Sequence, residues 1–299
     1  MQLLRLRLHH NSVEQFIVNI MKRFKGLLAI FFVLSLACGG FSSCSDDDDG
    51  LLNEKLLPSK IKSSNGESVV RFTYDEQNRL IKVNTTEIFD GEQTSELKIY
   101  YDELNKINQA VKTSSYGDGE EDIIRFSYEG ANKISYTYKD KENVLLAEGR
   151  GVIDSKGNLV WYEKKTYGIY ASSAVYDYEY DNDGNVIRTV VDEKYAEAHK
   201  YDNKNGIFRY VNTPQWFYSM PAFTEMVSII DPSHYSMNNL IMSDLVTAKS
   251  YKYQYNMHGY LSNVPLIGFE LMNGTKVGLP QPLNTADIEY IQSHPVNKE

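Results

Sequence analysis

The stretch Tyr101-Asp102-Glu103-Leu104-Asn105-Lys106-Ile107 decides the fold, because its pattern recurs seven times along the chain. The pattern is an aromatic or apolar residue, an acidic or amide residue, two variable positions, Asn or Gly, one variable position and an apolar residue. The first positions of the seven copies are Tyr74, Tyr101, Tyr128, Ile153, Tyr180, Tyr201 and Tyr255. Most copies start about 27 residues apart and the last step is twice as long, which indicates duplication of one supersecondary unit.

The chemistry of the motif is that of a tight turn. The acidic side chain at the second position can accept a hydrogen bond from a backbone N–H two residues later, which starts the turn. Asn and Gly, at the fifth position, are the residues that most easily adopt positive φ. We therefore expect a type I turn with a G1 bulge at each copy, after which the apolar seventh residue re-enters the sheet.

The residues around each motif alternate between apolar and polar, as in Ile124-Arg125-Phe126-Ser127-Tyr128. This period of two is typical of strands with one buried face. Each unit then holds two strands and two turns, so the sequence predicts an all-β fold. We expect up-and-down antiparallel hairpin repeats that form a large curved or barrel-like sheet, because a sheet of a dozen strands tends to curl.

The organisation of the chain follows from this rhythm. We expect the β-repeat domain to span 59–270, with a short helical or irregular insertion at 212–247 that begins near Pro214 and caps one end of the sheet. Residues 271–299 are predicted to form a C-terminal hairpin or tail, loosely held after Ala286.

The N-terminal region is predicted to be an export signal. Residues 21–43 have a basic start and a short apolar run, as in a lipoprotein signal peptide, and residues 1–20 are interpreted as a gene-model extension. Small residues precede Cys44, the predicted lipidation site, and a run of four Asp follows in an acidic flexible linker at 44–58. Cys38 is the alternative, but the Asp run lies directly behind Cys44.

Two resemblances follow from these residues. The Tyr-Asp…Asn/Gly…apolar motif resembles the YD repeat of RHS-type proteins. Together with the lipoprotein signal, the chain resembles an uncharacterised Bacteroidota surface-lipoprotein family with a porin-like β-fold, over roughly 60–270. The resemblance implies an outer-membrane protein that is lipid-anchored and exposed on the cell surface, and it brings no catalytic residues. A membrane-spanning barrel would alternate similarly, but here charged residues make the second face polar.

Composition excludes some partners and favours others. The net charge is −9, and removing residues 1–43 takes away five basic residues and one acidic residue, which leaves about −13. Such a surface disfavours nucleic acid, whose phosphates are bound by Lys and Arg. Both cysteines lie in the N-terminal region, so no disulfide framework or Cys-based metal site is expected in the body.

The sequence contains no local catalytic, metal or cofactor motif. Asp181-Asn182-Asp183-Gly184-Asn185 is faintly similar to a calcium loop, but a hairpin turn explains the same residues. We therefore expect no cofactor, and a membrane contact only through the lipid anchor.

Clustered aromatic residues are the remaining candidates for a site. We predict Trp161, Tyr162, Trp216 and Tyr218 as ligand-binding residues, because aromatic side chains dominate binding hot spots. Core packing is the competing interpretation, and it is favoured for Trp216. The expected function is a non-catalytic binding module for a glycan or an envelope protein. A structural or adhesive coat module is the alternative, followed by a glycoside hydrolase-type enzyme, whose two carboxylates need only meet in space.

Overall fold

The computed structural model describes residues 54–88, 91–115, 121–168, 171–220, 223–224, 227, 236–243, 253–265 and 285–295. Cys44, the predicted signal peptide and most of the acidic linker lie outside these residues. The described chain is almost entirely β, as predicted. Its strands are β1 (Leu56–Ser63), β2 (Ser68–Tyr74), β3 (Leu80–Ile88), β4 (Glu92–Tyr101), β5 (Ile107–Ser114), β6 (Glu121–Glu129), β7 (Lys133–Lys139), β8 (Leu145–Ile153), β9 (Leu159–Thr166), β10 (Ser172–Tyr180), β11 (Val186–Val191), β12 (Tyr195–Tyr201), β13 (Leu240–Ser243), β14 (Asn263–Pro265) and β15 (Thr285–Gln292).

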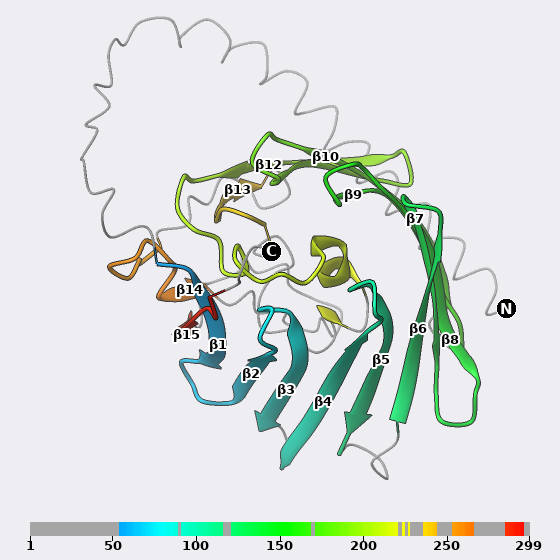
Figure 1. Cartoon of the computed structure of the whole chain (residues 1–299), viewed down its shortest axis with the longest axis horizontal. Helices are drawn as coiled ribbons and strands as arrows, with labels where there is room; N and C mark the ends of the chain where they lie inside the picture. Colours follow the sequence, from blue (N-terminus) through cyan, green and yellow to red (C-terminus); the bar gives the residue numbers. More distant parts are fainter. Residues whose placement is uncertain are drawn as a thin grey trace, which may run out of the picture. The chain divides into compact units, whose positions relative to one another are not determined.

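These strands form one antiparallel sheet in which each strand from β1 to β13 pairs with its neighbour in sequence. Beyond β1 the order continues with β15 and then β14. The sheet curves strongly, and its concave side surrounds the single-turn helix η2 (Gln215–Ser219) (Figure 1). Near the two edge strands, Asn205 and Tyr260 form an isolated parallel bridge. The segment after β12 therefore contacts the segment before β14, where the sixth and seventh motifs lie.

The predicted turn is confirmed in five of the seven motifs. In the first, the N–H of Asn78 donates to the carbonyl of Asp75, and Asn78 has a φ of 60°. The carboxylate of Asp75 accepts from the N–H groups of Gln77 and Arg79, which fixes the turn from inside. The other four left-handed fifth positions are Asn105, Gly157, Gly184 and Gly259.

Two motifs depart from the expected turn. In the third, Gly130 takes the positive φ in place of Asn132, because Glu129 stands where the other hairpins have a shorter Asp or Asn. In the sixth, Asp202 accepts from the N–H of Asn239, and the chain continues into the insertion rather than into a hairpin.

The C-terminal segment is not loosely held, which corrects the expectation for the residues after Ala286. β15 pairs with β1 along most of its length and also with β14. Ala286 and Ile288 are buried, and Tyr290 packs against the same core. The reason is the alternation of these three residues, which gives the strand one apolar face.

The core fills the concave side of the sheet, and the insertion supplies part of it. Phe208 packs edge-on against Phe72 of β2, with ring centroids 5.4 Å apart. Trp216 lies 5.5 Å from Phe126 of β6. Phe208, just before the insertion, and Trp216 within it thus contact strands far apart in the sheet, as a plug does. The insertion also contributes β13, which extends the sheet beyond β12.

Candidate ligand pocket at the motif-turn edge

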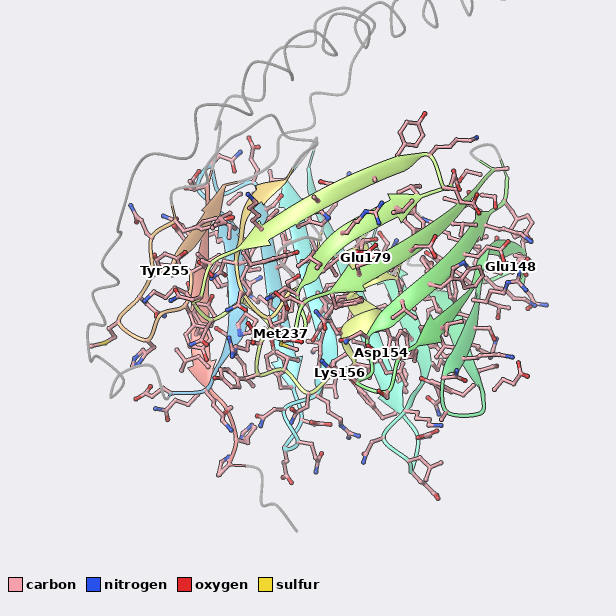
Figure 2. All side chains as sticks on the ribbon, turned by 90° about the horizontal axis from the view of Figure 1, so that it is seen from above. Glu148, Asp154, Lys156, Glu179, Met237 and Tyr255 are labelled. Carbon is pink, nitrogen blue, oxygen red and sulfur yellow. The ribbon has the colours of Figure 1, made fainter. Side chains whose placement is uncertain are left out.

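Consecutive motif turns meet the insertion at one edge of the sheet, and a pocket of about 430 Å³ lies between them. The second turn contributes Asn105 and Lys106, and the fourth contributes 153–158. Tyr128 of the third motif and Trp216 of η2 form aromatic walls, with ring centroids 6.4 Å apart. Asp154, Lys156 and Met237 gather at this place, whereas Glu148 lies at the far side of the molecule (Figure 2).

The pocket lies where the tyrosine of the repeat is missing. In five motifs the tyrosine hydroxyl donates to a backbone carbonyl of the preceding unit; the pairs are Tyr74–Pro58, Tyr101–Leu80, Tyr128–Ile107, Tyr180–Leu159 and Tyr201–Val186. Ile153 takes this position in the fourth motif and lines the pocket. A branched side chain without ring or hydroxyl occupies less space there than tyrosine does.

The acidic group of the pocket, the carboxylate of Asp154, is hydrogen-bonded within its own turn. One oxygen of Asp154 accepts from the N–H groups of Lys156 and Asn158, at 2.8 and 2.9 Å, and the other accepts from the Asn158 amide at 3.0 Å. Burial acts to raise the pKa of Asp154, but these hydrogen bonds, together with the charge of Lys156, outweigh it and lower the pKa. The carboxylate therefore stays ionised and has little capacity left for a ligand.

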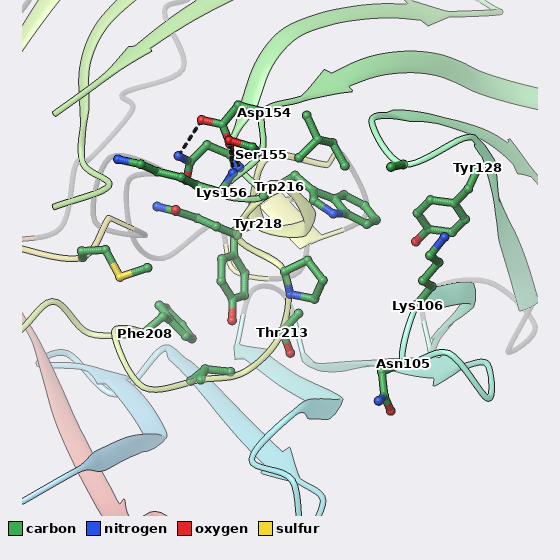
Figure 3. A pocket seen from close by; sticks show the side chains of 18 residues that line it. Asn105, Lys106, Tyr128, Asp154, Ser155, Lys156, Phe208, Thr213, Trp216 and Tyr218 are labelled. Carbon is green, nitrogen blue, oxygen red and sulfur yellow. Dashed lines mark hydrogen bonds between the residues drawn. The ribbon is translucent and has the colours of Figure 1, made fainter. Parts of the chain in front are cut away.

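Polar groups around the aromatic walls remain able to bind. The side-chain oxygen of Gln215 is buried and has no hydrogen-bond partner among the described residues, although its amide nitrogen donates to Gly184. Lys106 lies over the ring of Tyr128, with its ammonium nitrogen 4.9 Å from the centroid. Figure 3 shows Lys106 beside Tyr128, and Asp154, Ser155 and Lys156 on the other side of Trp216. The pocket thus combines aromatic faces with donors and one buried acceptor.

The aromatic residues predicted from the sequence separate into two groups. Trp216 and Tyr218 are almost fully buried, yet both line the pocket. Tyr162 faces the core, where its hydroxyl lies 2.9 Å from that of Tyr136. Trp161 points to the opposite face of β9, and the guanidinium of Arg150 lies 5.6 Å from its ring. The structure therefore brings Trp216 and Tyr218 together and leaves Trp161 and Tyr162 apart from them.

Lys106, Lys156, Asn158 and Gln215 were not predicted from the sequence. The loss of tyrosine at Ile153 marks a turn that lines the pocket, but no sequence signal singled out these four residues. Among the described residues, no group of three or more His, Cys, Asp or Glu side chains could hold a metal ion. No helix in the described part of the chain is long and apolar enough to cross a membrane.

Solved structures similar to this chain are found among known proteins. A porin-like protein from Bacteroides uniformis, solved by crystallography, superposes with a TM-score of 0.46 and 15% sequence identity. The match covers 79% of this chain and 97% of that protein. No protein-family model matches the chain, and no curated protein matches it.

Proposed function

We propose that this protein is a non-catalytic binding module that holds a glycan in the pocket at the motif-turn edge. The observation that carries the proposal is the pairing of the Tyr128 and Trp216 walls with the unpartnered oxygen of Gln215. Sugar rings stack on aromatic faces, and their hydroxyl groups donate to buried amide oxygens. A volume of about 430 Å³ suits one or two sugar units.

We propose that the pocket binds a sugar without cleaving it. A two-carboxylate hydrolase needs a second acidic group across the bond to be broken. Asp154 is the one carboxylate among the described lining residues, and its oxygens are engaged by the turn. The pocket is thus better suited to retention of a sugar than to its hydrolysis.

We place the module on the cell surface, held in the outer membrane by a lipid on Cys44. The support is the signal-like segment, the small residues before Cys44 and the Asp run behind it. Membership in a surface-lipoprotein family with YD-type repeats is part of the same proposal. Labelling cells with a palmitate analogue tests the anchor, since Cys44→Ala should abolish incorporation and Cys38→Ala should not.

Binding is tested with the purified full-length chain on a glycan array, followed by calorimetry with the best sugar. Ile153→Tyr should fill the pocket and weaken binding at least about tenfold. Tyr195→Ala, an exposed residue of β12 outside the pocket, is the control and should bind as the natural chain does.

A third variant, Trp161→Ala, separates the two candidate surfaces. If binding is lost in Trp161→Ala and kept in Ile153→Tyr, the glycan site lies on the outer face of β9 and the pocket proposal is wrong. If the natural chain binds no sugar at all, the coat-module alternative becomes the better account.

A further inference from the structure

Two lysines from different motif turns stand at this pocket. Lys106 is the sixth residue of the second motif, and Lys156 lies in the fourth. Figure 3 shows them on opposite sides of Trp216. The chain as a whole carries a net charge of −9, so two cationic groups at one pocket run against its general character.

Neither lysine forms a salt bridge with the residues that the structure describes. The first motif provides the contrast, because Arg79 at the sixth position pairs with Asp75 of its own turn at 2.6 Å. At the equivalent place Lys106 makes no ion pair within the described chain and lies over the Tyr128 ring instead. Lys156 likewise makes no salt bridge there; its side chain is exposed, and its charge contributes to the lowered pKa of the neighbouring Asp154 carboxyl.

The described lining of the pocket holds two lysines and one carboxylate, so its net charge is positive. The Asp154 carboxylate is already surrounded by three N–H donors of its turn. These hydrogen bonds hold the carboxylate in its own turn and leave its negative charge in place. One excess positive charge therefore remains for an incoming anion, next to aromatic walls that suit a sugar ring.

From this arrangement we infer that the pocket selects an acidic sugar, a pyranose that carries a carboxylate or a sulfate. The ring lies against Tyr128 and Trp216, and the anionic substituent is attracted by Lys106 and Lys156. The inference rests on the proposed function and adds the chemical class of the glycan to it. Lysine acts here as a flexible point charge, which accommodates either anion.

The test compares sugars that differ only in charge. The probes are oligosaccharides ending in glucuronate or galacturonate, their neutral glucose and galactose counterparts of equal length, and 6-sulfated forms of the neutral sugars. The full-length chain should bind an acidic probe about tenfold more tightly than its neutral counterpart, and added NaCl should reduce the difference. The carboxylated and sulfated arms identify which anion is preferred.

Variants assign the selectivity to the two lysines. Lys106→Met and Lys156→Met should each weaken the acidic probe about threefold to fivefold more than they weaken the neutral probe. Lys194→Met, an exposed lysine between β11 and β12, is the matched control and should alter neither affinity.

The possible outcomes distinguish failure of the acidic-sugar inference from failure of the glycan-binding proposal. Equal affinity for acidic and neutral probes would overturn the acidic class and leave glycan binding intact. Selectivity that survives both lysine substitutions would also overturn it. Failure of every probe to bind would remove the proposed function together with the inference.

Discussion

The hydroxyl of Tyr101 donates to the backbone carbonyl of Leu80 at 3.0 Å and lies 2.9 Å from the hydroxyl of Thr213. Thr213 also accepts the N–H of Leu80 at 2.8 Å. The first residue of one motif thus binds the last residue of the motif before it, and the insertion is bound to the same point. Repetition of this bond joins successive motif hairpins, because each tyrosine bonds to the adjacent strand, which belongs to the motif before it.

Removing this hydroxyl should destabilise the protein. Tyr101→Phe leaves the Leu80 carbonyl and the Thr213 hydroxyl short of a partner, at a cost of about 1–3 kcal/mol in the free energy of unfolding. Urea unfolding followed by circular dichroism measures it. Tyr100→Phe, on the exposed side of the same strand, is the control and should change stability by less than about 0.5 kcal/mol. Equal effects of both substitutions would contradict the role of the inter-motif bond.

Restoring tyrosine at the fourth motif should have the opposite effect on the fold. Ile153→Tyr can form the inter-motif bond that this unit lacks, whereas Ile153→Phe supplies the ring without the hydroxyl. We expect the tyrosine variant to be more stable than the phenylalanine variant by about 0.5–1.5 kcal/mol. Thermal and urea unfolding of the two variants measure this difference. Identical stabilities would show that no hydroxyl partner exists at this position.

The Asp at the second position should act through its oxygen rather than its charge. Asp102 accepts from the N–H groups of Leu104 and Lys106 through one oxygen. Asp102→Ala removes that acceptor and should lower the free energy of unfolding by about 1–2 kcal/mol, as loss of a helix cap does. Asp102→Asn keeps an acceptor oxygen and should retain most of the stability. A loss in Asp102→Asn as large as in Asp102→Ala would instead assign the effect to the charge.

Glycine on β8 makes room for the aromatic core. A Cβ on Gly149 would lie 2.4 Å from Cε1 of Tyr136 and 2.8 Å from the Glu163 carbonyl oxygen. Gly149→Ala should therefore cost about 1–3 kcal/mol in the free energy of unfolding through overpacking. Gly168→Ala provides the comparison, because a Cβ there meets no atom within 4 Å and the only strain comes from a φ of +86°. A smaller loss in Gly149→Ala than in Gly168→Ala would refute the crowding.

Alkaline pH should unfold the protein through its tyrosines. Burial raises the pKa of Tyr101 from 10.0 to about 12, and burial likewise raises the pKa of Tyr128 and Tyr180. At a pH between 10.0 and about 12, Tyr101 of the unfolded chain has released a proton that the folded chain still holds, so the free energy of unfolding falls as pH rises. Below pH 10.0 both states hold this proton and the free energy of unfolding is unaffected. Urea unfolding at a series of pH values, with phenolate absorbance in parallel, should show the loss beginning near pH 10. Stability that stays constant up to pH 12 would contradict it.

Much of the fold could be predicted because its signals are local. The turn at Asp75 closes through backbone groups two and four residues away, so the motif specifies it wherever the strands lie. Where the local chemistry changes, the prediction is wrong, as at Glu129, where Gly130 rather than Asn132 takes the positive φ. The pairing of Thr285–Gln292 with β1 was not predicted, because the segment carries no motif and its partner is more than 200 residues away.

The pocket could be predicted only in part. Trp216 and Tyr218 were found from composition, but the same composition also pointed to Trp161, which faces away from the core. Alternation along β9 places Trp161 and Tyr162 on opposite faces, and adjacent residues of one strand cannot line the same inner surface. Lys106 and Lys156 gave no signal, because an exposed lysine in a turn is ordinary in any sequence.

By itself, the sequence determined the hairpins, their antiparallel order and the position of the one motif that lacks an aromatic residue. These features depend on hydrogen bonds and side-chain alternation within a few residues of each other. The tertiary structure alone decided that Lys106, Lys156 and Trp216 meet at one pocket, and that β15 closes against β1. Such contacts depend on the curvature and register of the whole sheet, which sum over many strands and are not encoded in any single repeat.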